Sequence, residues 1–229
     1  MRVAFSLAQC LPFPAGPAPC RVLGRLQPGW LVREGRDVWL MFPPRVRETI
    51  LYERLMASHV MPCEKMAEPV VVHPGLLSED EARTALGLFT NTRRCPAKIT
   101  DRRITHNGFM LGLYSVAGHD GGNSSTFTIR LEGTCPLLAR YDVSDLRELL
   151  GRVASCQEDS VRGTRPTKVR EYLTSEATRL ARAMTSGELD KEAVEEMMIS
   201  KREILGTSTV CCVHGKPLMK FICSTDDEN

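Results

Sequence analysis

The order of hydrophobic periodicities along the 229-residue chain constrains its fold more than any other feature. Segments with the alternating pattern of strands dominate up to about residue 142, and segments with the period of amphipathic helices dominate after it. Runs of strands followed by runs of helices are typical of α+β proteins, whereas strict alternation is typical of α/β proteins. The sequence therefore predicts an α+β fold, with an antiparallel β-rich N-terminal and central region and a helical C-terminal third closed by a terminal β-hairpin.

Short segments rich in β-branched and apolar residues, bounded by glycine and proline, predict the strands. These segments are 2–8, 20–26, 30–32, 38–42, 69–73, 98–105, 109–116, 126–132, 137–141, 209–213 and 218–223. The tight-turn sequence His106-Asn107-Gly108 predicts that the strands 98–105 and 109–116 form a hairpin. The last two segments predict the terminal hairpin.

Helical spacing of apolar residues predicts five helices. They cover 45–58, 78–89, 144–153, 167–184 and 190–206. Ser78 and Glu81 have the spacing of a capping box at the start of the second helix, and Ser144 is the predicted cap of the third. We expect either two domains, residues 1–142 and 143–229, or one continuous domain.

Nine cysteines are scattered along the chain without a Cys-x-x-Cys pair. This scatter and the odd number favour a reduced intracellular protein, in the cytoplasm or the nucleus. Residues 1–18 partly resemble a secretion signal, but Gln9 interrupts a short apolar stretch and three prolines follow, so we expect no signal. The apolar runs are far shorter than the roughly 20 residues that span a bilayer, so we expect no membrane association.

No catalytic motif is present, because the chain has no Gly-x-Ser-x-Gly, His-Glu-x-x-His or phosphate-binding Walker sequence. We therefore predict no catalytic residue and no cofactor, and favour a protein that is not an enzyme. Two enzyme hypotheses stay open. One uses Cys95, whose neighbours Arg93 and Arg94 can stabilise a thiolate. The other uses His119 and Asp120, in a glycine-rich segment, as an acid–base pair.

Near the C-terminus, Cys212, His214 and Cys223 offer three metal ligands if the terminal hairpin brings them together. Zinc usually takes four ligands, and the adjacent Cys211 points to the opposite face of a strand. Burial of alternate hairpin residues explains the same cysteines, because a free cysteine packs like a small apolar residue. We favour core packing and predict no metal.

The segment 83–103 is the most basic part of the chain, with six cations against Asp101 alone. Several cations in one segment can contact nucleic-acid phosphates and give a salt-dependent affinity. The candidate contacts are Arg93, Arg94, Lys98, Arg102 and Arg103. A solvated polar face is the alternative explanation of this segment.

The C-terminal helices suggest a docking surface for a protein partner. Helix 190–204 carries Val194, Met197 and Met198 on one side, and Tyr172 lies on helix 167–184, which we expect to pair with it as a helical hairpin. A methionine-rich face adapts readily to a partner, although the same stripe also suits a core. The leading hypothesis is a regulatory or adaptor protein that binds a protein partner or a second copy, and the alternative is a nucleic-acid-associated regulatory factor.

Overall fold

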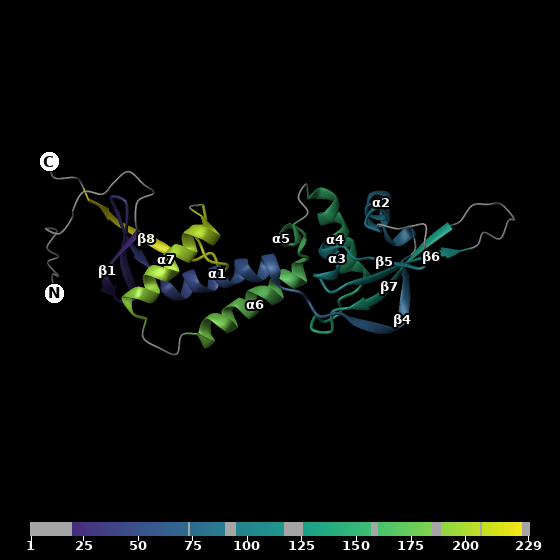
Figure 1. The fold of residues 1–229 in the computed structure, drawn as a ribbon, viewed down its shortest axis with the longest axis horizontal. Helices are drawn as coiled ribbons and strands as arrows, with labels where there is room; N and C mark the ends of the chain where they lie inside the picture. The colour runs from purple at the N-terminus through teal and green to yellow at the C-terminus, as the bar shows by residue number, and fades with distance from the viewer. Residues whose placement is uncertain are drawn as a thin grey trace. The chain divides into compact units, whose positions relative to one another are not determined.

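The computed structural model describes residues 20–72, 74–89, 95–116, 126–156, 160–184, 189–206 and 208–225 (Figure 1). The α+β class is confirmed, since the described chain contains two four-stranded antiparallel sheets and seven α-helices. It divides into two compact units, of which unit 1 joins residues up to 50 to those from 181 onward, and unit 2 comprises residues 51–180. The predicted boundary at residue 142 lies inside unit 2. No helix among the described residues is long and apolar enough to cross a lipid bilayer.

Unit 1 contains a sheet made from both ends of the described chain (Figure 1). Its strands, in order, are β1 (Cys20–Leu26), β2 (Gly29–Glu34), β3 (Asp37–Met41) and β8 (Met219–Ser224). The start of α1 (Pro43–Ser58) and α7 (Lys191–Leu205) supply side chains to the core of this unit. The core includes Val32, Met41 and Val46, each with no exposed surface. The last strand, β8, therefore pairs with β3, which lies about 180 residues earlier in the chain.

Unit 2 contains the second sheet, whose strands in order are β4 (Glu64–Val72), β7 (Thr126–Thr134), β6 (Met110–Val116) and β5 (Ala97–Lys98). Five helices and the 3-10 turn η1 (Pro74–Leu76) accompany it. The helices are α2 (Glu79–Gly87), α3 (Arg102–Thr105), α4 (Val143–Ser155), α5 (Val161–Thr164) and α6 (Thr167–Ala183), of which the last three residues, from Ala181, belong to unit 1.

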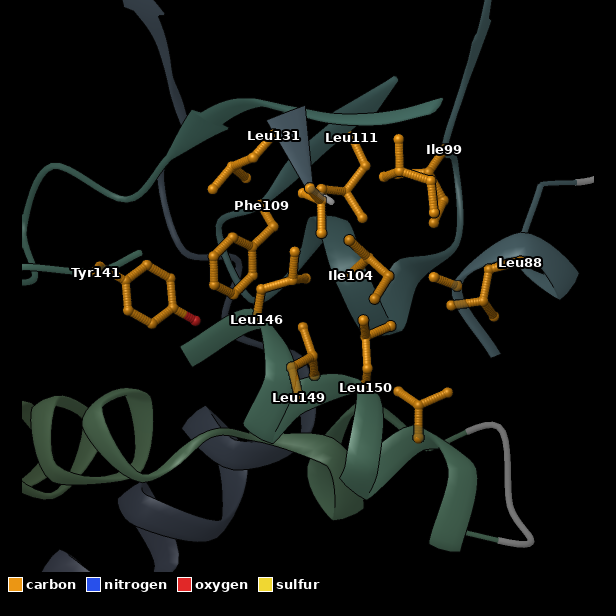
Figure 2. Close-up of a cluster of buried hydrophobic side chains, with 14 of the residues drawn as sticks. Leu88, Ile99, Ile104, Phe109, Leu111, Leu131, Tyr141, Leu146, Leu149 and Leu150 are labelled. Carbon is orange, nitrogen blue, oxygen red and sulfur yellow. The ribbon is translucent and has the colours of Figure 1, made fainter. Parts of the chain in front are cut away.

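The core of unit 2 lies between its sheet and α4. Figure 2 shows Leu146 and Leu149 of α4 directed toward Phe109, and Leu111 and Leu131 lying above them. These five side chains have at most 1% of their surface exposed. Full burial of a leucine or phenylalanine side chain contributes about 1.5–3 kcal/mol, so this layer stabilises the unit strongly.

Capping residues explain where two helices of unit 2 begin. The predicted capping box of α2 is confirmed, because Ser78 and Glu81 exchange side-chain to backbone hydrogen bonds. The box of α4 uses Asp142 and Asp145, so the prediction of Ser144 as its cap is wrong. Asp142 accepts the Ser144 N–H instead, which places the serine inside the first turn.

Three predicted strands differ in the structure. The predicted strand 98–105 is wrong beyond Lys98, because Asp101 caps α3, and His106-Asn107-Gly108 then ends that helix. The predicted strand 137–141 is also wrong, since these residues form turns and bends. At the C-terminus the hairpin is reduced to one bridge between Cys211 and Pro217, and β8 pairs with β3. The predicted strand 2–8 lies outside the described residues.

Arg165 joins three segments of unit 2 at a point with no exposed surface. Its guanidinium donates to the backbone oxygens of Leu55, Met56 and His59 at the end of α1, with Nε 3.2 Å from the Met56 oxygen. It also donates to the oxygens of His106, at 2.7 Å, and of the Asn107 side chain, at 3.3 Å. Burial lowers the pKa of Arg165 to about 10, so the side chain still carries its charge at neutral pH. A helix end is a favourable place for a cation, because its last carbonyl groups lack helical partners.

We expect Arg165→Lys to lower the free energy of unfolding by roughly 3 kcal/mol, because an ammonium group has three donors and leaves buried carbonyl oxygens unpaired. Urea denaturation followed by circular dichroism measures this change. The matched control is Arg83→Lys, whose side chain is 77% exposed and should change stability by less than about 0.5 kcal/mol. Equal stability of the two variants would contradict a central role for Arg165.

His59 and His106 should make unit 2 sensitive to mild acid. Burial, helped by the nearby charge of Arg165, lowers the pKa of both imidazoles below the ordinary value of 6.5. The unfolded chain therefore binds protons below pH 6.5 that the folded chain does not, and stability falls as the pH drops through this range. We expect the double variant His59→Gln, His106→Gln to lose less unfolding free energy than the unmodified chain between pH 7.5 and 5.5. Identical pH slopes in urea titrations would rule this out.

Candidate metal centre

Glu48, Cys212 and His214 form a compact group of potential metal ligands in unit 1. One ligand atom of each residue lies within 4.8 Å of the others, and a Glu48 carboxylate oxygen is 3.5 Å from Nδ1 of His214. Glu48 and Cys212 are buried, whereas the His214 side chain is 49% exposed. The group therefore combines two fixed inner residues with one that reaches solvent.

Two backbone segments bring these residues together. Glu48 lies in the second turn of α1, and the other two lie in the segment between α7 and β8, here named the metal-ligand loop (residues 210–218). The Cys212 N–H donates to the Lys216 oxygen at 2.8 Å, and Gly215 has φ 72°, a left-handed conformation that glycine adopts without strain. The loop is thus a closed turn that presents Cys212 and His214 on one side.

Hydrogen bonds fix the metal-ligand loop to the start of α1. Arg45 donates from Nη1 to the Pro217 oxygen at 2.8 Å, and the Phe42 N–H donates to the Leu218 oxygen at 3.0 Å. Leu218 is 1% exposed and packs in the core of unit 1 with Cys212. The loop and α1 are therefore held together by contacts that do not involve the candidate ligands.

The donor set fits Zn²⁺. Thiolate, imidazole and carboxylate are its usual protein ligands, at about 2.0–2.3 Å from the ion. Tetrahedral geometry at those lengths places ligand atoms about 3.3–3.8 Å apart, so small side-chain movements would close this group around an ion. Three protein ligands would leave one position for water or another group. Without an ion, a Glu48–His214 charge contact at 3.5 Å beside an apolar cysteine accounts for the same geometry.

The sequence prediction found two of these three residues. Cys223, its third candidate, lies in β8 opposite Val38 and is not part of the group. Glu48 was missed, because no spacing rule connects an acid in a helix to a cysteine 164 residues later. Cys211 is exposed and lies outside the group, as the sequence predicted. None of the eight cysteines in the described part of the chain forms a disulfide bond.

The candidate nucleic-acid residues do not form one described surface. Arg93 and Arg94 lie outside the described residues. Lys98 is exposed on β5, whereas Arg103 forms an ion pair with Asp101 at 2.8 Å. Arg102 donates to the His106 ring at 3.4 Å. Nucleic-acid contact by this segment therefore stays a prediction.

The candidate docking residues are mostly inside the protein. Val194, Met197 and Met198 are at most 8% exposed and pack in the core of unit 1. Tyr172 is partly buried against the core of unit 2, with its ring centroid 6.2 Å from that of His59. α6 and α7 contribute these residues to different cores, so the methionine-rich face packs as core. Docking of a partner through these helices remains a prediction.

Neither enzyme hypothesis gains a described site. Cys95 is partly buried, but its neighbours Arg93 and Arg94 are not described. His119 and Asp120 also lie outside the described residues. Within the part of the chain that the structure describes, the strongest chemical grouping is therefore the one at Glu48.

A comparison with known proteins relates the chain to a human protein. It is 30% identical over 208 residues to PMS1 protein homolog 1 of Homo sapiens, a match that covers 89% of this chain. The chain spans about a fifth of the length of that relative, 22%. No family model matches the chain. Identity at this level over most of the chain indicates distant homology to PMS1.

We expect the tag-free chain to retain about one zinc ion after dialysis, as measured by mass spectrometry of the metal. Cys212→Ser and His214→Gln should each lower zinc retention at least tenfold, because each removes one of three ligands. The matched control is Cys211→Ser, which changes the adjacent exposed cysteine and should bind as the unmodified chain does. Equal zinc content in all four proteins, or none in any, would show that the group is an ordinary cluster of packed and ion-paired side chains.

Proposed function

We propose that the chain acts in the nucleus in DNA mismatch repair, as a relative of the MutL-family protein PMS1, and that it binds a partner protein there. The observation that carries the proposal is the 208-residue match to PMS1 protein homolog 1. The match includes 89% of the chain, so it extends over most of both units. This reading favours the nucleic-acid-associated alternative over a general adaptor.

The outer strand of the unit 1 sheet supports partner binding. β8 pairs with β3 on one side and lies at the edge of the sheet among the described strands. Phe221 and Ile222 are 48% and 47% exposed on it. An exposed sheet edge with apolar side chains can accept a strand from another protein, with main-chain hydrogen bonds giving affinity and side chains giving specificity. The proposed partner contact is therefore the β8 edge.

In this proposal the candidate metal centre stabilises the segment that leads into β8. Glu48, Cys212 and His214 would hold a zinc ion in the segment just before β8. A bound ion would fix the metal-ligand loop and, through it, the start of the edge strand. It would also supply a Lewis acid near the surface, since His214 reaches solvent.

Direct DNA contact is the second candidate function. Lys98 is exposed and Arg83 is exposed on α2, where its ion pair with Asp80 contributes little in water. Both lie in the basic segment 83–103, which the sequence singled out. DNA binding through this segment would weaken steeply with salt.

The partner contact is tested by capturing the tagged chain from nuclease-treated nuclear extract and identifying bound proteins. We expect a mismatch-repair protein in stoichiometric amount, and a loss of at least tenfold with Ile222→Ser, because the substitution removes an exposed apolar side chain from the edge strand. The control is Leu137→Ser, which changes a 53% exposed side chain in a turn outside both sheets.

Three outcomes separate the hypotheses. Retention of the repair protein by Ile222→Ser would place the contact elsewhere. Loss of every partner on nuclease treatment would favour DNA contact, to be tested with Arg83→Glu and Lys98→Glu. Absence of repair proteins from all captures, together with an unchanged mutation rate in cells that lack the gene, would contradict the mismatch-repair proposal.

A further inference from the structure

Unit 2 contains a pocket of about 330 Å³ whose charged lining is mainly arginine. Its walls come from the second half of α1, the end of α4, α5 and the start of α6. Arg152, Arg162, Arg165 and Arg170 line this arginine pocket, against one lining carboxylate, Glu53. This volume is at the lower end of the range for small-molecule sites, about 300–1,000 Å³.

Positive charge exceeds negative charge at the described lining. Arg162 forms an ion pair with Glu53 at 2.7 Å, and Arg152 forms one with Glu148 at 2.9 Å. The other two arginines have no carboxylate partner among the described residues, since Arg165 is bound by carbonyl and amide oxygens and the exposed Arg170 guanidinium has no described partner. An anion in the pocket would meet two cations that no carboxylate among the described residues neutralises.

Residues that line this pocket also have hydrogen-bond donors without a described acceptor. A guanidinium has five N–H groups. Among the described contacts Arg162 donates from Nη2 to Glu53, and Arg152 donates from Nε and Nη2 to Glu148. Ser160 is the residue before α5 and its hydroxyl makes no capping bond. Arginine forks pair with the oxygens of an anion two at a time, and a phosphate has enough oxygens to pair with more than one guanidinium.

The rest of the lining provides an aromatic and apolar wall. Tyr52 and Met56 lie one turn apart on α1 and both border the pocket. An aromatic ring beside arginines is the combination that binds a nucleotide, because the base stacks on the ring while the phosphate pairs with guanidinium groups. The pocket volume suits one nucleotide unit.

We propose that the arginine pocket binds one nucleotide, with the phosphate held by Arg170, Arg162 and Arg152 and the base against Tyr52. The nucleotide is either free or the phosphorylated end of a DNA strand, and both sources share the same chemistry. The proposal stands on the geometry of unit 2 and is independent of the mismatch-repair role and of the metal centre.

The test is isothermal titration of the full chain at low salt with deoxyadenosine monophosphate, with deoxyadenosine, and with one short oligonucleotide carrying either a 5′-phosphate or a 5′-hydroxyl. We expect the monophosphate to bind and the nucleoside to bind at least tenfold more weakly. Tight binding of the 5′-phosphorylated oligonucleotide alone would identify a strand end as the ligand, and binding of the monophosphate alone would identify a free nucleotide.

Arg170→Gln should weaken phosphate-dependent binding about tenfold or more, because a charge-assisted hydrogen bond is lost. Folding should be unchanged, since the Arg170 side chain has no described partner to lose. Arg179→Gln is the matched control, also on α6, with a 65% exposed side chain outside the pocket. Arg162→Gln provides a second pocket variant, and thermal melting checks that each variant folds.

Several results would overturn the proposal. Equal affinity for the nucleoside and the monophosphate would exclude phosphate recognition. Unchanged binding by both Arg170→Gln and Arg162→Gln would place the ligand elsewhere. Binding of a phosphotyrosine peptide in place of all nucleotide ligands would assign the pocket to a protein partner. Absence of binding by any of these ligands to the folded chain would leave the arginines without a ligand role.

Discussion

The hydrogen bonds of Arg165 are the interaction on which unit 2 depends most. One side chain joins the end of α1, the end of α3 and the segment that leads into α6, three pieces that are far apart in sequence. A buried cation normally requires a carboxylate, because desolvation of a charge costs several kcal/mol. Here backbone carbonyl groups at helix ends take that role, and their dipoles already point their negative ends at the guanidinium. Neutral His59 and His106 lie beside it for the same reason, since a second buried cation would be unfavourable.

Asn107 and Tyr141 connect the hydrogen bonds of Arg165 to the apolar core of unit 2. The Asn107 side chain accepts from Arg165 and donates to the Arg103 oxygen, and its own backbone oxygen accepts from the Tyr141 hydroxyl at 2.9 Å. The Tyr141 ring stacks on Phe109 with centroids 4.4 Å apart. Next to Asn107, Gly108 has φ 79°, and a Cβ there would lie 2.8 Å from the Cβ of Cys135. The tight sequence at 106–108 is thus needed for packing around Arg165, although it resembles a hairpin turn.

Local signals in the sequence predicted most of the elements. The helices at α1, α2, α4, α6 and α7 follow from apolar spacing, and Ser78 with Glu81 fixes the start of α2. Strand pairing was not predictable, because the partner of β8 is chosen by a core that includes Val32 and Leu218 from opposite ends of the chain. The same is true of Glu48, whose neighbours Cys212 and His214 are set by the fold of unit 1. The Asp101 cap prevailed over the β-like pattern at 98–105, since its side chain accepts from the Arg103 backbone N–H at the start of this short helix.

A cluster of arginines in sequence is a poor guide to where positive charge acts. In the basic segment 83–103 the described Arg83 and Arg103 are paired with acids two or three residues away, and water screens much of what remains. The arginine pocket instead gathers its cations from positions 152–170, each of which looks unremarkable in its local sequence. Arg152 and Arg162 form ion pairs with acids from another turn or helix. Arg165 is buried among carbonyl groups, and Arg170 has no described partner. The field at that pocket arises from this incomplete neutralisation, which only the folded arrangement reveals.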